Sequence, residues 1–161
     1  MVTRFAQHVR TIVKAAEAEA RASASPTVEA EHVLLAISAL DGTDAQRVLA
    51  SAGLDHHAIK LALEREVHQS LSAAGITIDP GQLRHATIDP SRHLRMGAST
   101  KMALERAAKA LAGARQMQPC HLLIGVLGAQ AGTVPRMLAL AGVDQGNLTE
   151  RVRSTTDEKT Q

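Results

Sequence analysis

The first predicted element is a helix over residues 3–22, since apolar and polar positions alternate there with an α-helical period. Val9, Ile12, Val13 and Ala16 recur at helical spacing, and most of the charged residues of this segment fall between them. The pattern therefore predicts an amphipathic helix at the start of the chain.

Three further helices are predicted before residue 74, each bounded by residues that start or stop helices. Ser23 to Pro26 breaks the first helix, and Thr27 is expected to cap a second that stops near Asp41-Gly42. A short third helix is expected to end at Gly53, which suits a left-handed C-terminal position. Asp55 is a suitable N-cap for the fourth.

Residues 74–97 interrupt the helical pattern. Glycines and prolines are frequent there, and the sequence TIDP occurs twice. This composition predicts a linker, partly held on the surface, between two helical units.

The pattern of the first unit begins again after the linker. His121 matches His32 when the residue numbers differ by 89, and the same offset holds for almost thirty residues, pairing Leu34 with Leu123, Arg47 with Arg136, Leu49 with Leu138, Gly53 with Gly142 and Asp55 with Asp144. Upstream, an offset of 91 pairs Val13 with Leu104 and Ala16 with Ala107. The predicted organisation is a first repeat over 1–73, a linker over 74–97, a second repeat over 98–153 and a flexible tail over 154–161. We expect an all-α fold of two tandem four-helix repeats related by a pseudo-twofold axis.

Composition agrees with close helix packing and disfavours nucleic acid as a partner. Apolar residues make up 45% of the 161 residues, yet Phe5 is the sole aromatic. Single-stranded nucleic acids are bound largely through aromatic stacking, which this chain lacks. Its 18 basic and 16 acidic residues leave a formal charge of +2, too small to attract a polyanion or a membrane surface through net charge alone.

The number of cysteines and the length of the apolar runs indicate the cellular compartment that is expected for the protein. Cys120 is the only cysteine, which excludes an intrachain disulfide and a cysteine-based zinc site and favours a reducing cytoplasm. No apolar run approaches the ~18 residues of a membrane span, so neither export nor membrane anchoring is expected.

The repeated blocks resemble the Clp repeat, found in the N-terminal domain of ClpC- and ClpA-type AAA+ unfoldases. The resemblance rests on the alanine-rich first helix and on two doubled blocks: Glu31 to Ile37 with its second copy His121 to Leu127, and Ala52 to Asp55 with its second copy Ala141 to Asp144. In that family the domain sits on an ATPase ring and receives substrates and adaptors. No nucleotide-binding motif is present here. The resemblance therefore implies a bacterial protein-binding module without catalytic activity or cofactor, which either serves a Clp ATPase or protease complex or competes with it as a decoy.

The resemblance also implies candidate binding residues. In ClpC-like relatives, a glutamate binds the guanidinium of phosphorylated arginine, and basic or hydroxyl groups near the start of the first helix bind the phosphate. Carried over, the first site has Arg4 and Glu31, with Ala6 where relatives have threonine. The second site has Lys101 on its phosphate side but Cys120 in place of the glutamate. A thiol lacks the fixed negative charge, so we expect at most one working site.

A groove between the first and fifth helices accepts adaptors in the family and cyclic-peptide antibiotics in actinobacterial members. The corresponding residues are Phe5, Val9, Val13 and Leu104. These positions are expected to be mostly core, and the scarcity of aromatic residues weakens the transfer of antibiotic binding to this chain.

Two alternatives remain open from the residues themselves. Cys120 follows a proline at a predicted helix start, where the helix dipole favours a thiolate, so a thiol sensor or small enzyme is the alternative function. His32 and His121 occupy matching positions, but no second ligand lies three or four residues away. A structural role near the helix start is expected for both, and no metal site is predicted.

Overall fold

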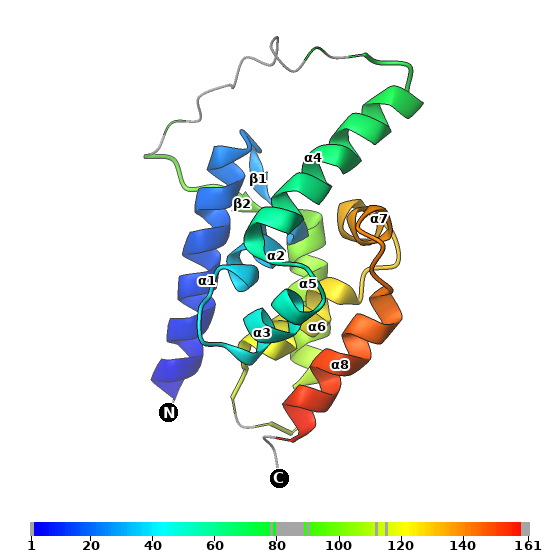
Figure 1. Cartoon of the computed structure of the whole chain (residues 1–161). Coiled ribbons are helices and arrows are strands. Elements are labelled where there is room, and N and C mark those ends of the chain that lie inside the picture. Colours follow the sequence, from blue (N-terminus) through cyan, green and yellow to red (C-terminus); the bar gives the residue numbers. More distant parts are fainter. Residues whose placement is uncertain are drawn as a thin grey trace.

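The fold consists of two helical units that follow one another along the chain (Figure 1). The computed structural model describes residues 2–77, 79, 89, 91–111, 113–114 and 116–158, with side chains from residue 7 onward. The first unit contains α1 (Val2–Ala22), α2 (Ala30–Ser38), α3 (Asp44–Ser51) and α4 (His56–Ala73). The second contains α5 (Ala98–Ala110), α6 (Pro119–Leu127), α7 (Thr133–Leu140) and α8 (Gln145–Asp157).

The second unit repeats the first element by element, which confirms the predicted all-α tandem repeat. Gly53 and Gly142 both adopt left-handed backbone conformations, at φ +75° and +70°. Asp55 then caps α4 by accepting a hydrogen bond from the Ala58 amide, as Asp144 caps α8. Between the units, α4 packs against α7 and α3 against α8, as a pseudo-twofold relation requires.

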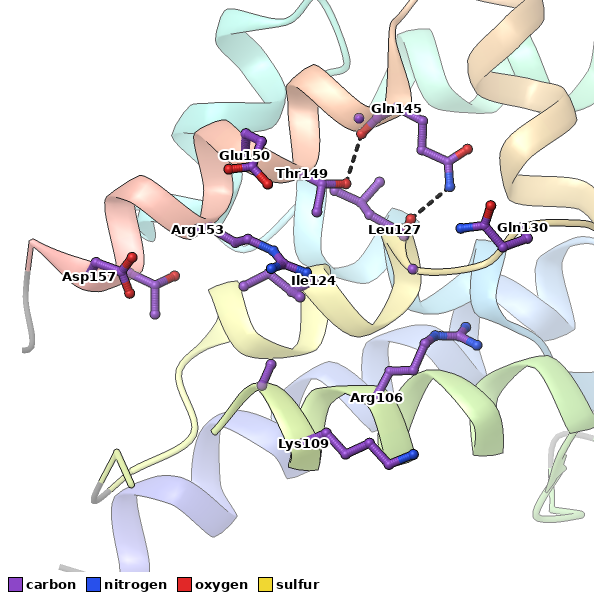
Figure 2. A pocket seen from close by; sticks show the side chains of 14 residues that line it. Arg106, Lys109, Ile124, Leu127, Gln130, Gln145, Thr149, Glu150, Arg153 and Asp157 are labelled. Atoms are coloured by element: carbon purple, nitrogen blue, oxygen red, sulfur yellow. Dashed lines mark hydrogen bonds between the residues drawn. The ribbon is translucent and has the colours of Figure 1, made fainter. Parts of the chain in front are cut away.

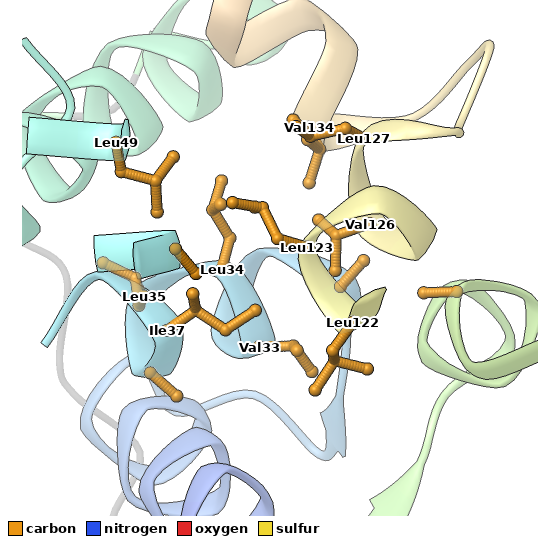
Figure 3. Close-up of a cluster of buried hydrophobic side chains, with 14 of the residues drawn as sticks. Val33, Leu34, Leu35, Ile37, Leu49, Leu122, Leu123, Val126, Leu127 and Val134 are labelled. Carbon is orange, nitrogen blue, oxygen red and sulfur yellow. The ribbon is translucent and has the colours of Figure 1, made fainter. Parts of the chain in front are cut away.

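The core lies where α2 meets α6 at the centre of the molecule (Figure 3). Both helices are apolar on nearly all sides, which is typical of helices surrounded by other elements. The matched pairs Leu34 and Leu123, and Ile37 and Val126, are all completely buried. Each unit thus supplies one central helix to a shared core, so neither buries its apolar surface alone.

Two short strands connect the units at the start of α2. β1 (Thr27–Val28) pairs in parallel with β2 (Arg95–Met96), at the end of the segment predicted as a linker. The Leu94 amide also donates a hydrogen bond to Glu17 on α1, at 3.0 Å. The last residues of the linker therefore have a defined place on the first unit.

Both predicted boundaries of α2 are wrong. Thr27 does not cap α2, because pairing with β2 holds residues 27 and 28 in extended conformation; Glu29 is the N-cap residue. The helix ends at Ser38 and not near Asp41-Gly42, since Leu40 and Asp41 form turns. At the other end of the chain, α8 continues to Asp157, beyond residue 153.

Candidate functional site

The start of α2 is held by a histidine cap. The Glu29 amide donates a hydrogen bond to His32 Nδ1 at 2.9 Å, and Ser23 Oγ lies 3.0 Å from Nε2 of the same ring. Burial lowers the pKa of His32, so the ring stays neutral and Nδ1 remains an acceptor. The ring thus joins the first turn of α2 to the end of α1.

The same cap recurs at the start of α6. The Gln118 amide donates to His121 Nδ1 at 2.8 Å, and burial again lowers the pKa of the ring. This confirms the structural role expected for His32 and His121. Within the described part of the chain, no group of three His, Cys, Asp or Glu side chains is arranged to hold a metal ion.

Glu29 links the start of α2 to the start of α5. Its carboxylate accepts hydrogen bonds from Thr27 Oγ1 at 2.8 Å and from the Ser99 hydroxyl, while Ser99 Oγ accepts from the Ala30 amide at 2.9 Å. Burial alone would raise the pKa of Glu29, but these hydrogen bonds outweigh it and hold the pKa below its usual value. Gly97 leaves room for this carboxylate, because a Cβ there would overlap it and the Glu29 side chain would have to move. Glu29 is therefore an engaged structural acid.

Glu31 follows Glu29 by two residues and lies in the first turn of α2, but its carboxylate has different surroundings. It is half-buried, and among the described residues its carboxylate has no side-chain hydrogen bond or ion pair. Burial raises its pKa, and the nearby charges of Glu29 and Glu66 raise it further, against the opposing effects of a hydrogen bond from its own backbone amide and of the Arg136 charge. The first turn of α2 therefore presents a carboxylate that lacks a bound cation.

The neighbours of Glu31 come from α4 and α7. Arg136 Nε lies 2.6 Å from Glu66 Oε1, and Ser70 Oγ donates to the same oxygen at 2.7 Å. The Glu66 side chain is only 5% exposed, whereas that of Arg136 is 56% exposed. Beside this pair, a cavity of about 410 Å³ lies between α4 and α7 and is lined by Glu66, Gln69, Ser70, Ala73, Arg136, Ala139 and Leu140. Glu66 thus fixes a guanidinium at the edge of a groove near Glu31.

Arg4 is not in position to share a site with Glu31. It lies in the first turn of α1, while Ser23, just beyond the last turn, contacts His32 in α2. At 1.5 Å per residue, α1 separates the two by roughly 28 Å, and Figure 1 shows the N-terminus and β1 at opposite ends of the helix. The structure therefore does not bring together the pair that the resemblance predicted. The side chains of Arg4 and Phe5 lie outside the described residues.

The phosphate side of the expected second site is also rearranged. Thr100 Oγ1 is buried and donates to the Val28 carbonyl at 2.7 Å, and the Ser99 hydroxyl is bound to Glu29, so neither is a free donor. Lys101 is exposed in the first turn of α5, near the start of α2. Cys120 opens α6, after the connection that leaves the opposite end of α5. The second pair of predicted residues does not form a compact site.

Cys120 is buried, with 5% of its surface exposed. A reactive cysteine needs access for its reagent as well as a low pKa. Its position at the start of α6 matches that of Glu31 in α2, so the second repeat has a buried thiol where the first has an unneutralised acid. This burial argues against the thiol sensor or enzyme.

The expected groove residues serve mainly the core. Val9 and Leu104 are partly buried and pack against the central cluster, and Val13 is half-buried.

None of the described helices is long and apolar enough to cross a bilayer.

The sequence interpretation missed Glu66 and Arg136. In the sequence, Arg136 was identified only as the residue that matches Arg47 in the repeat. Glu66 lies on a helix that has many charged positions and no distinguishing motif. Their pairing depends on the approach of α4 to α7, which residue spacing does not reveal.

Comparison with known proteins agrees with this architecture. The family model described as the Clp repeat (R) N-terminal domain matches residues 4–112, more than half of the chain. Among solved structures, the chain is similar to the N-terminal domain of the chaperone ClpD from Arabidopsis thaliana, with 19% identity, TM-score 0.67 and coverage of 92% of this chain and 91% of that one. It is also similar to a chain from a malarial protein secretion system, with 16% identity, TM-score 0.64 and coverage of 92% and 91%. No curated protein matches the sequence.

Proposed function

This chain belongs to the Clp repeat (R) N-terminal domain family, and we propose that it is a non-catalytic module that binds substrate or adaptor proteins of a Clp unfoldase. In Clp unfoldases, this domain is the part that receives substrates and adaptors. The fold and the family match support the general type of partner. The recognised chemical group is proposed from the Glu31 site.

We propose that Glu31 binds the guanidinium of a phosphorylated arginine on the partner. The observation that supports this is a half-buried carboxylate without a cation, with its pKa raised mainly by burial. A planar guanidinium donates two parallel N–H groups to such a carboxylate, and its positive charge offsets the repulsion from Glu29 and Glu66. Binding would thus relieve an electrostatic cost already present in the free protein.

Arg136 is the proposed partner for the phosphate. Its Nε is bound to Glu66, which leaves the two terminal nitrogens to face a ligand in the groove between α4 and α7. A guanidinium fixed in this way loses little conformational freedom when it binds an anion. Arg136 replaces Arg4 in this role because Arg4 lies at the far end of α1.

Calorimetry with free phosphoarginine tests the site. Glu31→Gln keeps the shape of the side chain and removes its charge, so it should weaken binding by roughly ten- to a hundredfold, the value of one charge-assisted hydrogen-bond pair. Glu64→Gln, which neutralises an exposed acid on α4, is the matched control and should leave affinity unchanged. Equal affinity of the wild type and Glu31→Gln would refute the assignment.

Two arginine variants separate the phosphate assignments. Arg136→Gln should weaken phosphoarginine binding more than binding of unmodified arginine, whereas Arg4→Ala should affect neither. The reverse result would restore the pairing of Arg4 with Glu31. We expect one molecule bound per chain, since Cys120 replaces the acid of the second repeat; two equivalents would contradict this.

The relation to an ATPase ring is tested by degradation assays with a ClpC-type unfoldase and an arginine-phosphorylated casein. If the chain delivers substrates, adding it should accelerate degradation. If it is a decoy, an excess should slow degradation, and Glu31→Gln should remove this inhibition. Adding a cyclic-peptide antibiotic to the same assay tests the groove at Val9, Val13 and Leu104.

A further inference from the structure

A cavity of about 910 Å³ lies between α5, α6 and α8 of the second repeat (Figure 2). It shares no lining residue with the groove beside Glu66. Its floor is apolar, made by Ala110, Ile124 and Leu127. Ile124 and Leu127 are at most 8% exposed, so this floor belongs to the rigid core of the repeat.

In the first repeat, a hydrogen-bonded pair spans the corresponding space. His56 Nε2 on α4 lies 2.5 Å from Glu19 Oε1 on α1 and ties these two helices together. The repeat offsets place Gln145 at the position of His56 and Ala110 at that of Glu19, so the second repeat has neither partner. Gln145 instead donates to the carbonyls of Leu127 and Ala129, at 2.7 and 2.6 Å. The second repeat thus lacks the hydrogen-bonded pair that ties α1 to α4 in the first.

The α5 wall of the cavity is basic. Arg106 Nε donates to the Gly125 carbonyl at 2.8 Å, which anchors the guanidinium next to α6. Lys109 extends from the same helix one turn later, and none of the ion pairs among the described residues includes it. Two cations therefore line this side of the cavity, and none of the residues of α5 that line it is acidic.

The α8 wall is mixed in charge. Arg153 points from α8 toward Ile124 on the floor (Figure 2). Glu150 and Asp157 line the same wall, and no ion pair among the described residues joins either of them to Arg153. Three cations against two acids give the cavity a positive balance, concentrated on the α5 side.

From this arrangement we infer that the α5–α6–α8 cavity binds an acidic peptide segment that carries a large apolar side chain. The apolar side chain packs on the floor, where Ala110 is half-buried and Ile124 and Leu127 are nearly buried, and acidic residues on either side of it meet Lys109 and Arg153. A small anion would leave the floor uncovered, and a purely apolar ligand would leave the cations without partners. A peptide supplies both groups. This surface is a second contact for a protein partner, separate from the Glu31 site.

Fluorescence anisotropy tests this inference with a labelled peptide of alternating Glu and Leu residues and the whole chain. Lys109→Glu and Arg153→Glu should each weaken binding by about tenfold, because both cations are exposed and each reversal replaces an attraction by a repulsion. Ala110→Glu should weaken it similarly by placing a carboxylate on the floor. Asp157→Lys should strengthen binding.

Controls separate the cavity from net charge and from the proposed phosphoarginine site. Lys60→Glu makes the same change of charge on α4 of the first repeat and should leave the peptide's affinity unchanged. Glu31→Gln should also leave it unchanged, so each proposal can fail without the other. Lack of peptide binding, an equal loss with Lys60→Glu, or equal binding of an Asp-only peptide without apolar side chains would each overturn the inference.

Discussion

A single added methyl group at Gly125 would disturb the packing of the second repeat. It lies in α6 at its closest approach to α5, and a Cβ there would overlap the Ala103 carbonyl oxygen and lie 2.9 Å from the Ala107 amide nitrogen. Both obstacles belong to the α5 backbone, so relief requires movement of the helix and not of one side chain. The corresponding residue of the first repeat, Ala36, is buried with its methyl group in place.

The size of the Gly125→Ala effect follows from two opposing contributions. Overpacking a core costs about 1–3 kcal/mol, and the backbone contacts place this case near the upper value. Replacing glycine by alanine within a helix returns about 1 kcal/mol. The net loss is about 2 kcal/mol in the free energy of unfolding, which lowers the melting temperature by about 4–8 °C in a chain of this length.

Thermal and urea unfolding followed by circular dichroism measure this loss. Gly146→Ala is the matched control, because a Cβ at Gly146 meets only Asp144 Oδ1 at 3.4 Å. The control should be neutral or slightly stabilising. If Gly125→Ala is as stable as the wild type, or shifts in the same direction as Gly146→Ala, the close approach of α5 to α6 is not as described.

Three further predictions concern titratable groups and the thiol. Burial lowers the pKa of His32 and His121 below 6.5, so at pH values just below 6.5 the unfolded chain binds more protons than the folded chain. The free energy of unfolding should therefore be highest above pH 6.5 and fall as the pH drops below it. Urea titrations at several pH values will measure this. The raised pKa of Glu31 means that its charged form lowers the free energy of unfolding at pH values above 4.5. The stability of Glu31→Gln relative to the wild type should therefore grow as the pH rises above 4.5, and a constant difference would contradict the assigned environment. Cys120 should react with iodoacetamide only in denaturant, since it is buried; rapid labelling of the native protein would revive the thiol alternative.

Much of the fold followed from local sequence. Helical periodicity predicted α1, and Gly53 and Asp55 marked the end of α3 and the start of α4, because left-handed glycines and N-caps act through contacts within a few residues. The constant offset between the repeats predicted the second unit from the first. The placement of His32 and His121 at helix starts was likewise local.

The contacts between units were decided only by the tertiary structure. Glu29 binds Ser99, and Glu66 binds Arg136, across about seventy residues of sequence. The resemblance to the Clp repeat brought Arg4 and Glu31 into one hypothesis, but the length of α1 separates them in space. The sequence by itself determined which helices form and that they form twice, because both depend on local spacing and repetition. Which side chains meet was settled by how α4 packs on α7 and α5 on α2, since such meetings depend on the relative placement of rigid helices.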